Sequence, residues 1–132
     1  MSKAVQALLL AAGAALAGCG AGGSEHDVTQ VMERFQAALS DGDGAAACAE
    51  LSESTRSALE QQEKKPCARA VLSLGLEGGG EVSRSKVYIT SAFAEADGQA
   101  AFLDQTPSGW RISQAGCTPG PDDLPFDCDL ED

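Results

Sequence analysis

The spacing of apolar residues changes once along this chain of 132 residues, and that change constrains the fold more than any other feature. Before Gly75, apolar residues recur at helical intervals, whereas after Val82 the sequence alternates and is rich in β-branched and aromatic residues. Three consecutive glycines, Gly78–Gly80, separate the two parts. Helices followed by a meander of strands are typical of an α+β domain whose helices pack on one face of an antiparallel sheet. We therefore expect one such domain over residues 27–132.

Four helices are predicted before the glycines. The first follows Asp27, a favourable N-cap residue, and ends at the turn formed by residues 41–44. Its apolar stripe consists of Val28, Val31, Met32, Phe35, Ala38 and Leu39. A second, short helix follows Asp43, a third covers about residues 54–62, and a fourth starts near Pro66, which suits the first turn of a helix.

Strands are predicted after the glycines. Residues 82–96 read as one strand, with a bulge near Thr90 or Ser91 because Val87 and Ile89 otherwise point away from the core. The strands that follow should complete a sheet with one face on the helices. That inward face is expected to carry Ala101, Leu103, Trp110 and Ile112.

Two turns set the register of the later strands. Asp97-Gly98 is a strong signal for a two-residue hairpin, which places Phe93 opposite Phe102. A turn at residues 106–109 aligns two further pairs, Leu103 with Ile112 and Asp104 with Arg111. The acidic tail after Cys117 contains three prolines, and we expect it to form a loop on the sheet.

The first nineteen residues have the pattern of an export signal. Lys3 precedes an apolar run from Ala7 to Leu16, which is shorter than the roughly 20 residues that a membrane-spanning helix needs. The segment Leu16-Ala17-Gly18-Cys19 resembles the bacterial lipobox, whose cysteine is diacylated on sulfur and becomes the new N-terminus. This resemblance implies a signal peptide over residues 1–18, a lipid anchor on Cys19, and a lipidated flexible tether over residues 19–26. The protein would then lie on the extracytoplasmic face of the cell membrane.

Charge restricts the partners of the chain. Twenty acids and nine bases give a formal net charge of −11, and loss of Lys3 with the signal peptide would lower it to −12. A nucleic-acid partner is not expected, because phosphate contacts need a basic stripe. An anionic membrane would also repel such a chain, so the lipid itself would have to hold the protein at the membrane.

Four cysteines follow the predicted anchor. They are Cys48, Cys67, Cys117 and Cys128, an even number in a chain predicted to reach an oxidising compartment, where disulfides persist. Four cysteines allow three connectivities, and we favour Cys48–Cys67 and Cys117–Cys128 because the members of each pair are close in sequence. A zinc site is not expected, since no CxxC motif occurs and the only histidine, His26, belongs to the tether.

Several segments together resemble small lipoproteins of high-GC Gram-positive bacteria that have a nuclear transport factor 2-like, or cystatin-like, domain. These segments are the lipobox ending at Cys19, Asp41-Gly42-Asp43-Gly44-Ala45-Ala46-Ala47-Cys48, Cys67, Gly109-Trp110-Arg111-Ile112, Gly116-Cys117 and Cys128. The resemblance implies a curved antiparallel sheet wrapped around N-terminal helices to form a cone. In that family the cone is an enzyme pocket, a ligand site or only a core. This chain lacks the His/Asp pair of the enzymatic members.

No residue pattern predicts catalysis, a cofactor or a metal. Asp41 and Asp43 begin an EF-hand-like run, but Ala45, Ala46 and Ser52 replace its later ligands and its glycine. The serines lack the context of a nucleophile. The candidate binding surface is aromatic: Phe93 and Phe102, with Phe126 as a cover, and Trp110 either in the core or lining the cone.

The expected function is that of a non-enzymatic, membrane-anchored accessory or protein-interaction module. It would act as a monomer and meet a protein of the cell envelope. The alternative is a small-ligand-binding protein that uses the cone-shaped cavity beside Trp110.

Overall fold

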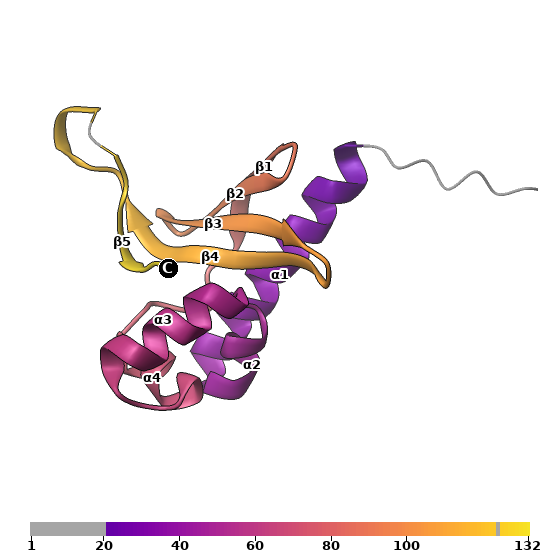
Figure 1. The fold of residues 1–132 in the computed structure, drawn as a ribbon. Helices are drawn as coiled ribbons and strands as arrows, with labels where there is room; N and C mark the ends of the chain where they lie inside the picture. The colour runs from indigo at the N-terminus through magenta and orange to yellow at the C-terminus, as the bar shows by residue number, and fades with distance from the viewer. Residues whose placement is uncertain (1–20, 124) are drawn as a thin grey trace, which may run out of the picture.

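The computed structural model describes residues 21–123 and 125–132 and has an α+β architecture (Figure 1). Within these residues the helices come first: α1 (Ala21–Asp41), α2 (Gly44–Ala49), α3 (Glu53–Glu63) and α4 (Cys67–Ser73). The strands follow: β1 (Val82–Tyr88), β2 (Ser91–Ala96), β3 (Gln99–Thr106), β4 (Gly109–Thr118) and β5 (Asp127–Leu130), with a 3-10 helix, η1 (Pro121–Asp123), before β5. The five strands form one antiparallel sheet in sequence order. The predicted class, with helices packed on an antiparallel sheet, is confirmed.

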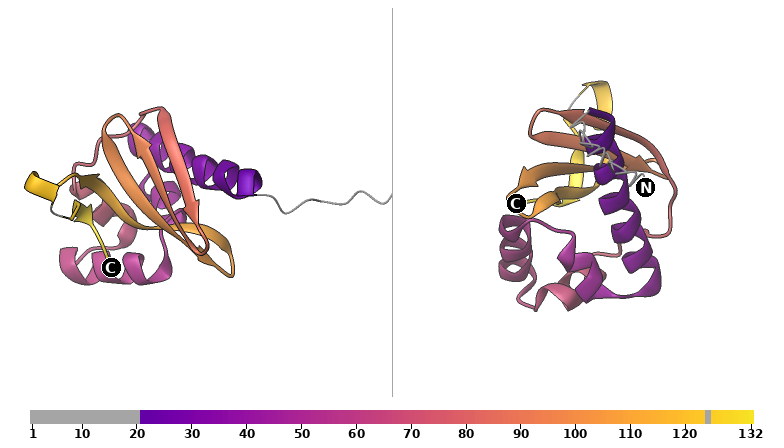
Figure 2. Two further views of the ribbon diagram at one scale, coloured as in Figure 1. Left: turned by 90° about the horizontal axis from the view of Figure 1, so that it is seen from above. Right: turned by 90° about the vertical axis from the view of Figure 1, so that its right-hand side faces the viewer.

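The core lies between one face of the sheet and the helices (Figure 2). Met32 and Phe35 of α1 and Leu59 of α3 are among its largest buried side chains. The predicted inward face is confirmed, because all four of its members are buried: Ala101, Leu103, Trp110 and Ile112. The alanines of β2 that face the helices have small side chains, so the helices can pack close to the sheet: Ala92, Ala94 and Ala96.

Helix α1 begins at Ala21, so residues 21–26 of the predicted tether are helical and the predicted start at Asp27 is wrong. Two contacts hold residues 25 and 26 in this helical extension. The Ser85 hydroxyl of β1 donates a hydrogen bond to the Glu25 carbonyl at 3.5 Å, and the His26 side chain is hydrogen-bonded to the side chain one turn later. The signal segment 1–18 and Cys19 lie outside the described residues.

Residues 82–96 form a hairpin rather than the single bulged strand predicted. The chain reverses at Ile89 and Thr90, so that Val87 on β1 lies opposite Ala92 on β2. Both side chains then contact the core. A hairpin turn, rather than the expected bulge, therefore places Val87 on the core side of the sheet.

The bulges that do occur in the later strands lie in β4. Ala100 pairs with Cys117, Phe102 with Gln114 and Leu103 with Ile112, so β4 has two more residues than β3 over this stretch. Bulges bend a strand and increase its twist. Gly116 permits one of them, because its φ is 65° and a Cβ there would lie 2.6 Å from the Leu76 side chain.

The tail forms a strand where a loop was predicted. Residues 127–130 pair with β4, and the pairing places Cys128 directly opposite Cys117, to which it is disulfide-bonded. Leu130 is buried against the sheet, which gives this acidic segment an apolar contact. The second disulfide joins Cys48 of α2 to Cys67 of α4, so both predicted pairings are confirmed.

Candidate functional site

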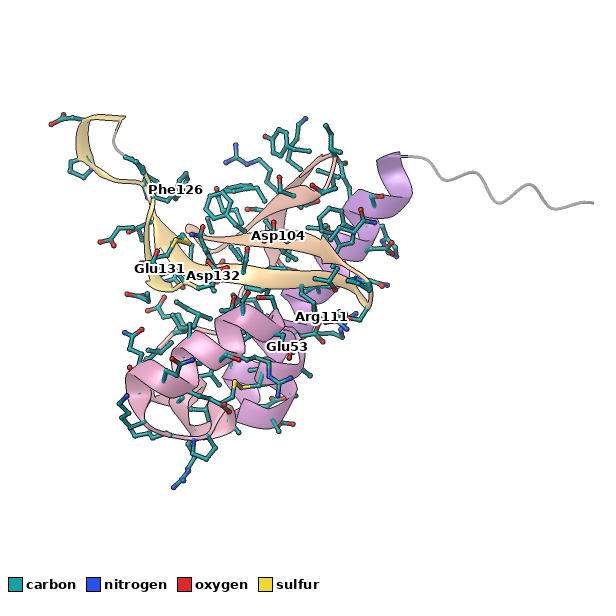
Figure 3. The ribbon with its side chains drawn as sticks, viewed as in Figure 1. Glu53, Asp104, Arg111, Phe126, Glu131 and Asp132 are labelled. Carbon is teal, nitrogen blue, oxygen red and sulfur yellow. A yellow bond between two sulfur atoms is a disulfide. The ribbon has the colours of Figure 1, made fainter. Side chains whose placement is uncertain are left out.

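Three phenylalanine rings form a cluster on the sheet face that points away from the helices. Phe93 of β2 and Phe102 of β3 are directly paired, as predicted, with ring centroids 5.5 Å apart. Phe126, which precedes β5, packs on both rings at 6.0 and 5.4 Å. Its label in Figure 3 lies on the opposite side of the sheet from α3 and α4. Tilted and edge-on contacts of this kind are favourable for aromatic rings.

The alternation of β2 explains why Phe93 lies on this outer face. The alanines of β2 are buried against the helices, whereas Phe93 and Glu95 between them are only partly buried. Because neighbouring strands keep paired residues on the same side, Phe102 follows Phe93 to the outer face. Val87 of β1 does not belong to this cluster, because it packs on the core.

Strand β1 adds three residues to the cluster. Arg84, Lys86 and Tyr88 line a pocket of about 450 Å³ together with the three phenylalanines. We call these six residues the aromatic groove: Arg84, Lys86, Tyr88, Phe93, Phe102 and Phe126. The β1 residues were not predicted as a site. Their spacing at every second position was the available signal, since it places all three on one face of a strand.

The rim of the groove is basic although the chain is strongly acidic. The Arg84 guanidinium lies 5.0 Å from the centre of the Phe93 ring and forms an ion pair with Glu95 at 3.0 Å. Lys86 is exposed and lies opposite Phe93 in the sheet. An aromatic floor with cationic side chains at its edge is suited to an apolar group that carries a negative charge.

A disulfide fixes the third ring of the groove. Phe126 is two residues before Cys128, whose bond to Cys117 attaches the tail to β4. Phe126 is nevertheless 40% exposed, so it covers the other two rings only in part. The groove therefore presents partly open aromatic surface to solvent.

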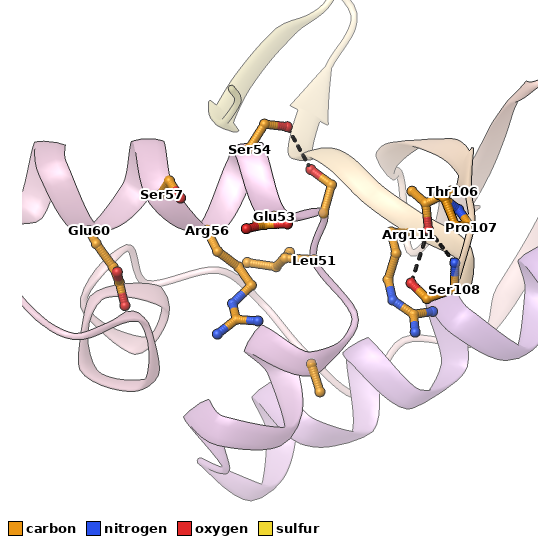
Figure 4. A pocket seen from close by; sticks show the side chains of 12 residues that line it. Leu51, Glu53, Ser54, Arg56, Ser57, Glu60, Thr106, Pro107, Ser108 and Arg111 are labelled. Atoms are coloured by element: carbon orange, nitrogen blue, oxygen red, sulfur yellow. Dashed lines mark hydrogen bonds between the residues drawn. The ribbon is translucent and has the colours of Figure 1, made fainter.

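A second cleft, of about 870 Å³, lies between α3 and the β3–β4 turn (Figure 4). Arg56 and Arg111 line it, but so do Glu53 and Glu60. The Ser52 hydroxyl accepts a hydrogen bond from the Thr55 amide and so serves as the N-cap of α3. The Glu60 carboxylate accepts a hydrogen bond from the Cys67 backbone amide at 2.8 Å, at the start of α4. Ser52 and Glu60 are thus engaged in holding the fold. The cleft as a whole carries both positive and negative side chains.

The other sequence candidates are not brought together into a site. Asp104 lies opposite Arg111, as predicted. The Arg111 side chain, however, donates a hydrogen bond to the Trp110 carbonyl at 2.8 Å, and Asp104 is exposed. Trp110 is 6% exposed and packs in the core, so it does not line an open cone. His26 is exposed on α1 and bonded to Gln30 at 3.1 Å.

Electrostatics single out one pair away from the groove. Arg34 of α1 and Glu50 after α2 form two hydrogen bonds, at 2.7 and 3.0 Å, and this contact raises the pKa of Arg34 above its usual value. Arg34 is therefore charged throughout the physiological range, and the pair joins α1 to the end of α2. Its role is structural.

The part of the chain that the structure describes contains neither a metal-binding cluster nor a membrane-spanning helix. Over residues 21–123 and 125–132, no group of three His, Cys, Asp or Glu side chains is arranged to hold a metal ion. In the same part of the chain, no helix has both the length and the apolar character needed to cross a membrane. No protein-family model, curated protein or solved structure matches this chain.

Proposed function

We propose that this protein is a lipid-anchored extracytoplasmic lipoprotein that binds a partner protein of the cell envelope and does not act as an enzyme. The lipobox-like segment ending at Cys19 supports the anchor. Two disulfides support an oxidising compartment, where such bonds persist. We also propose a domain of the nuclear transport factor 2-like type, which the order of helices and meander and the bulges of β4 support.

One observation carries the proposed binding activity: the aromatic groove. Phe93, Phe102 and Phe126 are in mutual contact on the free face of the sheet, and the most exposed of the three comes from a segment held by its own disulfide. Aromatic side chains with a neighbouring arginine are enriched at the centres of protein interfaces. The partner would present an apolar segment that includes an acidic residue, because Arg84 and Lys86 lie at the rim.

Photo-cross-linking in intact cells tests this proposal. A photoreactive phenylalanine analogue replaces Phe126 in one strain and Leu72 in another; these residues are 40% and 39% exposed, so accessibility is matched. We expect a discrete cross-linked protein from position 126 and none from position 72, which lies on α4. Adding Arg84→Glu should reduce the cross-link, because it reverses the charge at the rim.

Equal cross-linking from both positions would contradict a specific site. The mass of the protein extracted from its own membrane tests the anchor separately. Loss of residues 1–18, acylation of Cys19 and two disulfides are expected, and an unacylated chain would overturn the proposed location.

A further inference from the structure

We propose that the tip of the β1–β2 hairpin, formed by Tyr88, Ile89 and Thr90, inserts into the surface of the bilayer to which the chain is anchored. The inference rests on the proposed lipid anchor and adds a second, direct contact with lipid. This contact would fix the orientation of the domain relative to the membrane.

Exposure at the tip is the first observation. Ile89 is 92% exposed and Tyr88 is 60% exposed, the two highest values among the large hydrophobic residues that the structure describes. Ile89 also has a φ of 52°, a left-handed conformation that β-branched residues rarely adopt. Glycine or asparagine would fit this turn without strain. The turn thus holds an apolar side chain in solvent where the backbone favours a small or polar one.

The position of the tip relative to α1 is the second observation. Strand β1 runs antiparallel to α1: Gly80 donates to the Gln36 side chain at one end, and Ser85 bonds to the Thr29 hydroxyl and the Glu25 carbonyl further on. From Ser85 to Ile89 the chain advances about 13 Å at the rise of a strand. From Glu25 back to Ala21 a helix covers only about 6 Å. The tip therefore lies at least level with the start of α1.

Figure 1 shows the β1–β2 turn and the first turn of α1 at the same end of the molecule. Cys19 precedes Ala21 by two residues, which even in extended form span no more than about 7 Å. A lipid on Cys19 would therefore hold the hairpin tip next to the bilayer. At the resulting effective concentration, a contact too weak to bind the membrane alone becomes occupied.

Charge and residue type agree with a lipid surface. Residues 82–94 contain Arg84 and Lys86 and no acid, in a chain with more than twice as many acids as bases. Tyrosine is enriched at membrane–water interfaces, and lysine extends its charge to the headgroups. The acidic strand β5 lies at the opposite side of the molecule from the tip (Figure 1), so in this orientation its acids are kept away from anionic headgroups.

Quenching of tryptophan fluorescence by brominated lipids tests the inference. Ile89→Trp is compared with Leu72→Trp, both in the acylated full-length protein reconstituted into vesicles of equal parts phosphatidylcholine and phosphatidylglycerol, with or without bromine on the acyl chains. The wild-type protein gives the signal of Trp110, which is buried. Since Ile89 is almost fully exposed, its replacement should leave the fold intact, and a melting curve verifies this.

We expect bromine to quench Ile89→Trp several times more than Leu72→Trp or the wild type. If Ile89→Trp in acylated protein is quenched no more than the wild type, the tip contact is overturned but the proposed anchor is not. Equal quenching of both variants overturns it too, because the whole domain would then lie on the lipid. If the mass of the same sample shows no acyl chain, the proposed anchor fails and this inference fails with it.

Discussion

At the scale of single residues, Thr55 connects the helices to the sheet. It is fully buried, and its hydroxyl donates to the Ser113 carbonyl at 3.0 Å and is hydrogen-bonded to the Ser52 hydroxyl at 2.7 Å. Ser113 is the extra residue of a β4 bulge, whose backbone is displaced from regular pairing. The hydroxyl therefore satisfies a carbonyl that the bulge has freed, next to the N-cap of α3.

Thr55→Val should lower the free energy of unfolding by about 2 kcal/mol, because it keeps the shape of the side chain but leaves the Ser113 carbonyl buried without this partner. Chemical denaturation measures the change. Thr55→Ser is the control: it keeps the hydroxyl and loses one methyl group, so it should cost about 1 kcal/mol. A valine variant as stable as the serine variant would show that the hydrogen bond is unimportant.

At the scale of elements, the tail depends on its disulfide. Strand β5 has four residues, two of them acidic, and it pairs with β4 alone at the edge of the sheet. The Cys117–Cys128 bond closes a short segment and keeps β5 beside β4. Because Phe126 belongs to that segment, the same bond completes the aromatic groove.

The double variant Cys117→Ser, Cys128→Ser should lower the free energy of unfolding by about 3 kcal/mol, the value that chain entropy predicts for a loop of this size. Amides of β5 should also exchange hydrogen with solvent much faster, because the strand detaches. The matched control is Cys48→Ser with Cys67→Ser, which removes a bond between helices. That variant should lose a similar free energy of unfolding. Its β5 amides, however, should exchange no faster than this loss of global stability requires. Unchanged exchange in β5 after loss of its own disulfide would show that pairing alone holds it.

At the scale of the whole molecule, net charge is the dominant electrostatic feature. The chain has a formal net charge of −11. The described residues form two ion pairs, Arg34–Glu50 and Arg84–Glu95, and both arginine side chains are more than half exposed. Exposed pairs contribute little to stability, whereas excess charge of one sign repels itself in the compact state. Screening by salt should therefore relieve more repulsion than it removes attraction.

Raising sodium chloride from about 0.01 to 0.15 M shortens the screening length from roughly 30 to 8 Å, and the melting temperature should rise by a few degrees. Thermal unfolding followed by circular dichroism measures it. Potassium chloride should give the same rise, which distinguishes screening from binding of a particular cation to the acidic tail. A fall in melting temperature would mean that attractive pairs outweigh the net charge.

Part of the binding surface could be predicted from the sequence, and part could not. Phe93 and Phe102 were predicted as a pair because a two-residue turn at Asp97-Gly98 fixes their register locally. Arg84 and Tyr88 were missed because the reversal at residues 89–90 contains no glycine, asparagine, aspartate or proline that would signal a turn. Trp110, for which the sequence left two positions open, is 6% exposed and belongs to the core.

Local signals in the sequence were enough to predict the α+β order, the inward face of the sheet and the favoured pairing of Cys48–Cys67 and Cys117–Cys128. Each depends on periodicity, turn chemistry or closeness along the chain, which are local properties. The tertiary structure was needed to show where α1 begins, that the tail becomes β5, and that Phe126 packs on β2 and β3 across the outer face. Those features depend on contacts between segments far apart in sequence, such as Ser85 with Glu25, which no local pattern encodes.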